Sequence, residues 1–173
     1  MKEQIVDTNV PVVANDKDAA RSECVLNCAR ALEELMLSGC LVIDADWKIL
    51  TEYMRNLKTN GAEPKIGDRF LKWVLTNKSN PSRCTQIKLS TTLAAGVTHY
   101  DSFPKHAELK MFDINDRKFL AIANTHPEHP PIMQAADCKW WGYRNAFKEC
   151  GIRVIFLCEK EIEAKFKSKI KNE

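Results

Sequence analysis

The sequence predicts an α/β protein, a three-layer α/β/α sandwich around a mainly parallel central sheet. Segments with apolar residues at helical spacing separate short apolar runs, which is the pattern of parallel sheets covered by helices on both faces. The chain has 173 residues and shows no repeat or linker, so we expect one domain spanning residues 1–173. The runs expected as doubly buried strands are 5–6, 41–43, 132–133 and 154–157.

The first half of the chain alternates strand and helix signals. The apolar residues Val25, Ala29 and Leu32 recur at helical spacing, and Gly39 ends that helix. A continuous apolar run then ends at Asp44, as a buried strand would. The expected elements are strand 5–6, helix 18–38, strand 40–43, helix 47–57 and helix 66–74.

The second half begins with its least readable part. Residues 76–106 are rich in Asn, Ser and Pro at their start, so we expect a mobile loop with one strand near 86–89. Regular patterns then resume. The expected elements are helix 115–124, strand 131–134, helix 140–149, strand 152–157 and a basic amphipathic helix from residue 159 onward.

Composition narrows the functional classes. The net charge of +3 is too small to indicate a partner by itself. No apolar run approaches the length of a membrane span and the N-terminus lacks a signal-peptide core, so we expect no membrane partner. The odd count of seven cysteines without such a signal favours reduced thiols and a cytoplasmic location.

Two of the cysteines invite a metal interpretation. Cys24 and Cys28 are four residues apart in a helical pattern and therefore share a face. No second ligand pair at zinc-finger spacing accompanies them. The sequence favours buried, inert thiols over a structural zinc site.

Acidic residues stand where strands end or helices begin. Asp7 closes the first apolar run, and Glu52, Asp116 and Asp137 occupy comparable positions in later elements. A carboxylate at the carboxyl end of a buried strand points to the crevice where open α/β sheets bind ligands. Carboxylates that converge there repel one another unless a hard cation holds them. The sequence therefore predicts a Mg²⁺ or Mn²⁺ site formed by these four residues.

Other acids compete for two of these positions. Asp113 is three residues from Asp116 and could share a helical face with it. Asp44 and Asp46 compete with Glu52 as ligands, although a turn that caps the helix beginning at residue 47 explains them equally well.

The ordered set of acids resembles the PIN-domain nucleases. The motifs are Asp7-Thr8-Asn9 after the first strand, Glu52 on an early helix, Asp116 at the start of a helix and Asp137 after a strand. The resemblance spans nearly the whole chain. It implies a metal-dependent nuclease whose four acids are both the catalytic residues and the metal ligands.

The resemblance has further implications for the site and its partners. Thr8 and Asn9 would hold Asp7 or contact phosphate, and Asp113 would support the site. RNA is favoured over DNA as the substrate, so the chain would be an endoribonuclease. As in toxin members of the family, an inhibitory or regulatory protein would be a partner.

One alternative of another class stays open. Ala135 and Ala136 stand before Asp137, where the family usually has a hydroxyl residue. The chain would then be a catalytically degenerate PIN-like module that binds RNA or a protein. In either case, the lysines that crowd the C-terminal segment could contact phosphates.

Overall fold

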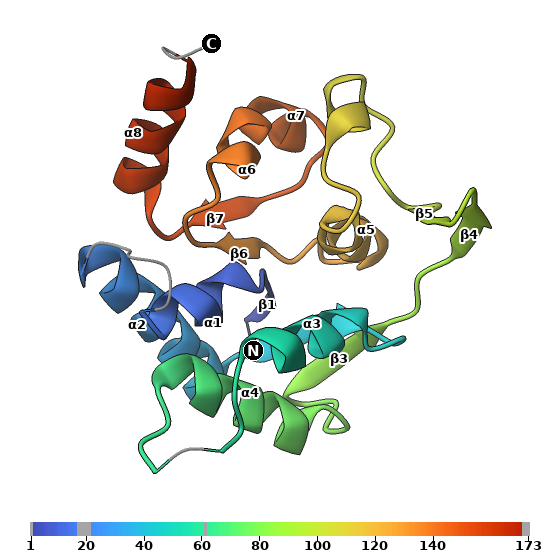
Figure 1. The fold of residues 1–173 in the computed structure, drawn as a ribbon. Helices are drawn as coiled ribbons and strands as arrows, with labels where there is room; N and C mark the ends of the chain where they lie inside the picture. Colours follow the sequence, from blue (N-terminus) through green and yellow to red (C-terminus); the bar gives the residue numbers. More distant parts are fainter. Residues whose placement is uncertain (1, 17–21, 61, 171–173) are drawn as a thin grey trace.

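The computed structural model describes residues 2–16, 22–60 and 62–170, and its centre is a five-stranded sheet with helices on both sides (Figure 1). Each neighbouring pair in this sheet is parallel, with the order β3-β2-β1-β6-β7. The predicted α/β class with a mainly parallel sheet is therefore confirmed. The strands are β1 Glu3–Val6, β2 Cys40–Asp44, β3 Cys84–Ile87, β6 Ile132–Gln134 and β7 Val154–Phe156.

The strand order reverses at β1. From β1 the chain crosses to β2 and then β3 on one side, and it later returns to β6 and β7 on the other. Right-handed crossovers consequently place the helices of the two halves on opposite faces of the sheet, as in a three-layer sandwich. The gap between the carboxyl ends of β1 and β6 is the topological switch point, where ligands bind in such sheets.

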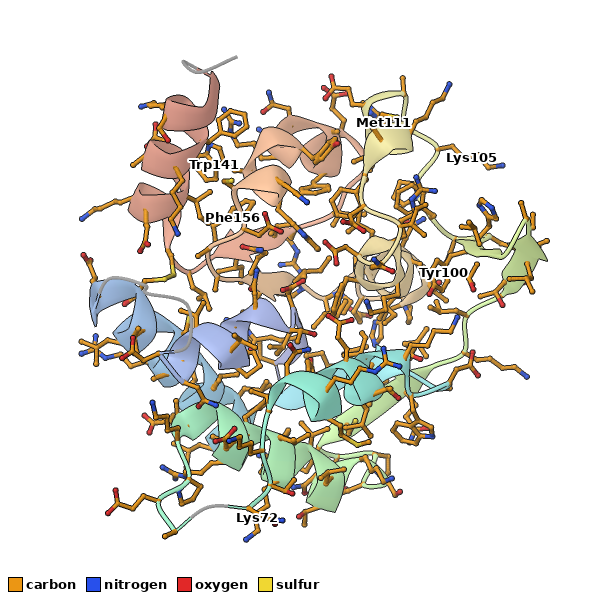
Figure 2. The ribbon with its side chains drawn as sticks, viewed as in Figure 1. Lys72, Tyr100, Lys105, Met111, Trp141 and Phe156 are labelled. Carbon is orange, nitrogen blue, oxygen red and sulfur yellow. A yellow bond between two sulfur atoms is a disulfide. The ribbon has the colours of Figure 1, made fainter. Side chains whose placement is uncertain are left out.

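The helices fill the connections between strands. The helices α1, α2 and α4 pack against one another, and α8 packs on α6. In Figure 2, Trp141 and Phe156 lie in the region between α6, β7 and α8, and their rings meet edge to face. The α-helices are α1 Asn9–Ala14, α2 Ser22–Ser38, α3 Lys48–Asn56, α4 Ile66–Asn77, α5 Arg117–Thr125, α6 Cys138–Gly142, α7 Arg144–Glu149 and α8 Glu159–Ile170.

Two helical segments differ from the expectation. The short helix α1 follows β1 directly, where the sequence analysis assigned no element. Pro11 fits there because it lies in the first turn, whose N–H groups have no partner within the helix. The prediction of one continuous helix over 140–149 is wrong, because Tyr143 separates two short helices, α6 and α7. The expected start of helix 18–38 lies outside the described residues up to position 21, and α2 is described from Ser22.

The least readable segment contains a hairpin. Beyond β3, the strands β4 Thr91–Ala94 and β5 Val97–Tyr100 pair antiparallel as a separate two-stranded sheet. Ala95 and Gly96 connect them, and both have positive φ angles, as a tight two-residue hairpin turn requires. Where we expected a loop, the chain forms a hairpin that lies at the periphery of the molecule (Figure 1).

Strand β7 is not doubly buried, contrary to the expectation for residues 154–157. Ile155 is 36% exposed, and its two neighbours in the strand are only partly buried. The reason is its place at the edge of the sheet, where it pairs with β6 alone.

The cysteines also depart from the expectation. Cys24 in α2 and Cys158 before α8 form a disulfide, so the prediction of reduced thiols is wrong for these two residues. They are 134 positions apart, and the pairing depends on how the fold brings α2 to the start of α8. The remaining thiols are free: Cys28, Cys40, Cys84, Cys138 and Cys150.

Within the described residues, no helix has both the length and the apolar character needed to cross a membrane.

The close approach of α1 and α4 yields the first prediction. A Cβ atom on Gly67 would lie 2.1 Å from the Pro11 carbonyl oxygen and 2.9 Å from Asn15 Oδ1, which accepts the Gly67 N–H. We expect Gly67→Ala to destabilise the fold by about 2–3 kcal/mol, the upper range for overpacking. For a chain of this size the melting temperature should fall by roughly 4–12 °C.

Thermal unfolding followed by circular dichroism measures this change. Gly142→Ala is the control, because its added Cβ would meet only the edge of the Phe166 ring, at 3.1 Å. Equal melting temperatures for both variants would contradict the tight α1–α4 contact.

Candidate functional site

Asp7 lies at the switch point of the sheet. It follows β1 directly, and its backbone N–H donates to the Met133 carbonyl of β6 at 2.9 Å. The residue is only 6% exposed, and its Oδ1 accepts the backbone N–H of Asn9 at 2.9 Å. The carboxylate is thus fixed between the ends of the two central strands.

Tyr53 holds the backbone immediately before Asp7. This fully buried residue of α3 donates its hydroxyl to the carbonyl of Val6 at 2.5 Å, immediately before Asp7. Burial, followed by the charges of Asp7 and Glu52, raises the pKa of Tyr53 well above its usual value. The phenol therefore stays protonated and serves as a donor that positions the end of β1.

Glu52 immediately precedes Tyr53 in α3. Its Oε2 pairs with the ammonium of Lys118 in α5 at 2.6 Å. Lys118 is only 5% exposed and also donates to the carbonyl of Asn115. Since a buried ammonium is costly unless it is paired, this lysine depends on the carboxylates around it.

Asp116 stands just before α5 and is held by an aromatic side chain. Its Oδ2 accepts a hydrogen bond from the indole Nε1 of Trp140 at 3.0 Å. Trp140 is buried and packs against Phe112, Phe119 and Phe147. The position of Asp116 is therefore set by the aromatic core under α5 and α6.

The three carboxylates affect one another. Burial and the charge of Asp116 raise the pKa of Asp7 well above its usual 3.8, and the charge of Glu52 adds to this effect. The Asn9 N–H and Lys118 act in the opposite direction. Burial likewise raises the pKa of Asp116, against the effects of Trp140 and Lys118. Asp7, Glu52 and Asp116 thus form one electrostatically coupled cluster, which we call the carboxylate cluster.

Asp137 lies at the margin of this cluster. Its charge acts on Asp116 but is not among those that perturb Asp7. Its Oδ1 accepts the backbone N–H of Lys139 at 2.8 Å and thereby caps α6. Of the four predicted acids, three converge and the fourth lies beside them with a capping role.

The competing acids have other positions. Both oxygens of the buried Asp44 accept backbone N–H groups at the start of α3, from Lys48 at 2.7 Å and Ile49 at 2.9 Å. Asp46 is exposed in the turn before α3. Asp113 is also exposed, and its Oδ1 accepts the N–H of Asn115 at 2.9 Å, although its charge still raises the pKa of Asp116.

Thr8 and Asn9 connect the ends of β1 and β6. The Asn9 side chain accepts the backbone N–H of Ala135 at 3.0 Å, while its own N–H holds Asp7. Thr8 Oγ1 is buried without a hydrogen-bond partner among the described residues, as is Gln134 Nε2 at the end of β6. Polar groups at both strand ends are therefore left for a ligand.

The donor set suits a hard divalent cation. Oxygen ligands from carboxylates are what Mg²⁺ and Mn²⁺ prefer, and a site of two or three acids completed by water suffices. When ionised, the carboxylate cluster and Lys118 together retain two negative charges, which one divalent cation balances. The buried Thr8 oxygen and the raised pKa of Asp7 fit the same interpretation.

A groove of about 820 Å³ adjoins the cluster. Its walls come from α3, from the β4–β5 hairpin and from the segment that leads into α5. Tyr100, labelled in Figure 2, lies on the hairpin side, and the ammonium of Lys48 lies over its ring at 5.1 Å. The groove is lined by Lys48, Glu52, Arg55, Asn56, Gly96, Val97, Thr98, Tyr100, Ile114, Asn115 and Lys118.

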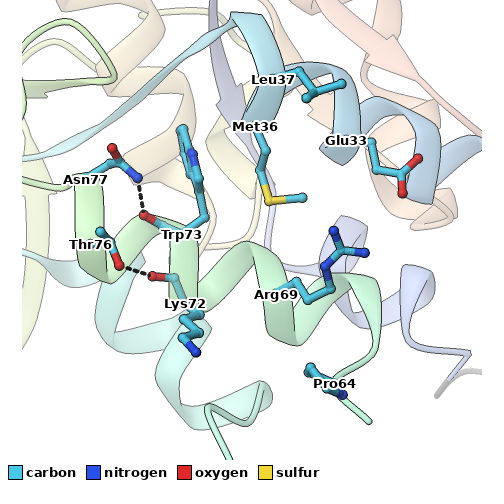
Figure 3. Close-up of a pocket in the computed structure, with 9 residues that line it drawn as sticks. All are labelled: Glu33, Met36, Leu37, Pro64, Arg69, Lys72, Trp73, Thr76 and Asn77. Carbon is cyan, nitrogen blue, oxygen red and sulfur yellow. Dashed lines mark hydrogen bonds between the residues drawn. The ribbon is translucent and has the colours of Figure 1, made fainter.

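A separate cavity of about 760 Å³ lies between α2 and α4 (Figure 3). It contains none of the predicted site residues. Its lining residues are Glu33, Met36, Leu37, Pro64, Arg69, Lys72, Trp73, Thr76 and Asn77. Of the predicted site residues, Glu52 lines the groove beside the carboxylate cluster, and none lines this cavity.

Three residues that shape the site were not identified from the sequence: Lys118, Tyr53 and Trp140. Each acts through a partner distant in the chain, which periodicity does not reveal. The one available signal was Lys118, a charged residue next to the apolar residues Phe119 and Leu120 that form the buried side of α5.

No family model, curated protein or solved structure matches this chain.

The coupled carboxylates predict how stability depends on pH. Because the pKa of Asp7 is raised in the folded protein, its contribution to stability is fully present below the unfolded value near 3.8 and is lost as the pH rises through the folded value. In metal-free buffer, Asp7→Asn should therefore become progressively more stable than the wild type as the pH rises toward neutrality. Chemical denaturation of both proteins across this range measures the difference. A difference that does not change with pH would contradict the coupling.

Proposed function

We propose that the protein is a divalent-metal-dependent nuclease that hydrolyses phosphodiester bonds. The observation that carries the proposal is the convergence of Asp7, Glu52 and Asp116 at the switch point of the sheet, with the pKa of Asp7 strongly raised. These three residues would hold Mg²⁺ or Mn²⁺. Asp137 would contribute indirectly, since its charge raises the pKa of Asp116. The resemblance of the ordered motifs to PIN-domain nucleases supports the same assignment.

The bound ion would activate water near neutral pH and stabilise the charge that develops on the phosphate. The chain's own residues prepare the site for it. Tyr53 and Asn9 fix the Asp7 carboxylate, and Trp140 fixes that of Asp116. Such preorganised groups need no rearrangement when the substrate binds.

Lys118 has a balancing role in this proposal. Its ammonium pairs with Glu52 and lowers the pKa values of Asp7 and Asp116. It therefore favours the ionised carboxylates that a metal requires, while it limits their repulsion before the metal binds.

The groove gives the substrate a path to the carboxylates. Lys48 and Arg55 line it together with Lys118, and Glu52 belongs to both the groove and the cluster. Cations along a groove contact phosphates irrespective of sequence. We propose RNA as the substrate in preference to DNA, an assignment supported by the resemblance alone.

A second candidate function is binding without cleavage. It is favoured by the capping role of Asp137, whose carboxylate is engaged with Lys139 N–H, and by the alanines that precede it. A PIN-like module of this kind would use the same groove to bind RNA or a protein partner.

Replacement of one carboxylate separates the two functions. Asp7→Asn keeps the acceptor for the Asn9 N–H but removes a metal ligand, so cleavage of labelled RNA should fall by roughly 100-fold or more. Asp46→Asn, at an exposed position outside the cluster, should retain wild-type activity. Cleavage assays with Mg²⁺, Mn²⁺ and a chelator test both expectations. A wild type that cleaves neither RNA nor DNA with either metal would favour the binding module.

Metal binding should also be visible in stability. At about 100 times its dissociation constant, a cation that binds only the folded state stabilises it by about 2.7 kcal/mol. The melting temperature of the wild type should therefore rise by about 5–10 °C with Mg²⁺ or Mn²⁺. Asp7→Asn should show a much smaller shift, and equal shifts would exclude Asp7 as a ligand.

The groove makes a prediction about salt. Each phosphate contact with a single strand contributes about 0.7 to the slope of log K against log salt concentration. The double variant Lys48→Ala/Arg55→Ala should therefore weaken RNA binding and reduce this slope by roughly 1.4, whether or not the RNA is cleaved. Binding measured by fluorescence anisotropy, with Asp7→Asn as the background, tests this.

The other cavity offers a matched control. Like the groove variant, Arg69→Ala/Lys72→Ala removes one arginine and one lysine charge, here at exposed positions of α4 (Figure 3). The groove assignment predicts little change in affinity or slope for this variant. A larger effect there than at Lys48 and Arg55 would place the RNA on α4 instead.

A further inference from the structure

A second group of potential ligands shares no residue with the carboxylate cluster. The sulfur atoms of Cys24, Cys28 and Cys158 all lie within 4.8 Å of one another, and all three residues are buried. Cys24 and Cys158 are joined in a disulfide, and the thiol of Cys28 lies 3.9 Å from the sulfur of Cys158. Helical spacing predicts proximity only for Cys24 and Cys28, because Cys158 comes from the other end of the chain.

We propose that Cys24, Cys28, Cys158 and Glu161 form a binding site for Zn²⁺, or a cation of similar softness, that becomes available when the Cys24–Cys158 disulfide is reduced. Structural zinc sites are tetrahedral and use sulfur, nitrogen or carboxylate ligands. With zinc–sulfur bonds of about 2.3 Å, two sulfurs of such a site are about 3.8 Å apart. The separation of Cys28 and Cys158 already has this value, to within about 0.1 Å.

The independent observation that points to a ligand is Glu161. This residue is only 9% exposed, and its Oε2 is buried without a hydrogen-bond partner among the described residues. Its other oxygen, Oε1, lies 3.3 Å from the ammonium of Lys165. Burial of the Cys28 thiol and, after it, the charge of Glu161 raise the pKa of that thiol to about 12. Glu161 lines the same cavity as Cys24 and Cys158, and its backbone N–H donates to the Cys158 carbonyl at 3.0 Å. Its side chain would supply the fourth ligand that three cysteines lack.

The surrounding backbone favours negative sulfur. Cys24 lies in the first turn of the 17-residue helix α2, and Cys158 immediately precedes the 12-residue helix α8. The N-terminus of a helix stabilises an anion, including a thiolate. Two such ends converge on the cysteines, and the Asn27 side chain holds them together through a bond to the Leu157 carbonyl at 3.1 Å.

Space for a cation is present as well. A cavity of about 260 Å³ is lined by Cys24, Cys158 and Glu161, together with Asn27 and neighbouring residues. The cavity gives a cation space beside three of the four proposed ligands, and Cys28 lies behind them at 0% exposure. None of these residues belongs to the carboxylate cluster, so the two sites would bind different classes of metal independently.

The chemistry of the switch balances. A dithiol reductant transfers two electrons to the Cys24–Cys158 disulfide, becomes a disulfide itself and leaves a thiol on each cysteine. Binding of Zn²⁺ then displaces one proton from each of the three thiols, while Glu161 binds as the carboxylate. Reoxidation by a disulfide oxidant would release the metal and restore the bond between Cys24 and Cys158.

Cobalt substitution tests the proposal directly. The protein, reduced with a dithiol and freed of metal, is titrated with Co²⁺ under anaerobic conditions. We expect one equivalent to produce the sulfur-to-cobalt charge-transfer absorption and the visible bands of a tetrahedral ion, and Zn²⁺ to remove them. Carboxylate-bound Co²⁺ gives no such charge-transfer absorption, so the carboxylate cluster does not interfere.

The variants identify the ligands. Cys28→Ala should bind Co²⁺ more than about tenfold more weakly than the wild type. Loss of a group that only hydrogen-bonds to a metal ligand already lowers metal affinity by at least about tenfold, and Cys28 would be a ligand itself. Cys84→Ala, which removes another buried free thiol, should match the wild type. Glu161→Gln should retain the charge-transfer absorption but bind more weakly than the wild type.

The outcomes that would overturn the proposal are equally definite. They are a disulfide that resists the dithiol, a reduced protein without the charge-transfer absorption, or equal affinities of Cys28→Ala and Cys84→Ala. If Cys28→Ala fails to fold, the melting temperature of the reduced wild type decides. Zn²⁺ should raise it and a chelator should reverse the increase, whereas the absence of a shift would refute the site.

Discussion

The burial of the Asp7 carboxylate at the reversal of the strand order is the constraint on which the site depends. The parallel strands β1 and β6 both end there, and the backbone N–H of Asp7 belongs to their pairing. A carboxylate in such a place cannot move away from its neighbours, so Asp116 and Glu52 act on it directly. Two aromatic side chains position the carboxylates: Tyr53 holds the backbone before Asp7, and Trp140 donates to Asp116. The ammonium of Lys118 offsets part of their negative charge.

The energetic cost of this arrangement comes from the desolvation and mutual repulsion of the carboxylates. Desolvation and like charge both favour the protonated form of Asp7, whereas a divalent cation favours the ionised form. The fold thus holds these carboxylates together at some expense of stability. The cysteine cluster differs because two of its three sulfurs, those of Cys24 and Cys158, are joined by a covalent bond until a reductant opens it.

Much of the fold could be predicted from the sequence. The strands β1, β2 and β6 are wholly buried apart from Glu3, and continuous apolar runs are the signature of such strands in parallel sheets. The β4–β5 hairpin was missed because β4 is fully exposed and carries no pattern that a core imposes. The edge position of β7 was missed because an apolar run does not reveal how many neighbours a strand has.

The site was predictable in part for a related reason. A carboxylate at the end of a strand, such as Asp7, or at the start of a helix, such as Asp116, can be located from the local sequence. Their long-range partners cannot: the pairing of Lys118 with Glu52 and that of Cys24 with Cys158 are products of the topology. The sequence also gave no means of separating Asp137, which caps α6, from the acids that converge.

The central claim is that Asp7, Glu52 and Asp116 together bind a divalent cation. The most direct measurement is the anomalous diffraction of a crystal soaked in Mn²⁺, with data collected near the manganese edge. The account predicts an anomalous peak in contact with carboxylate oxygens of these three residues, at the carboxyl ends of β1 and β6. A fully soaked crystal with no peak there, and with the carboxylates bound only to protein groups, would contradict it.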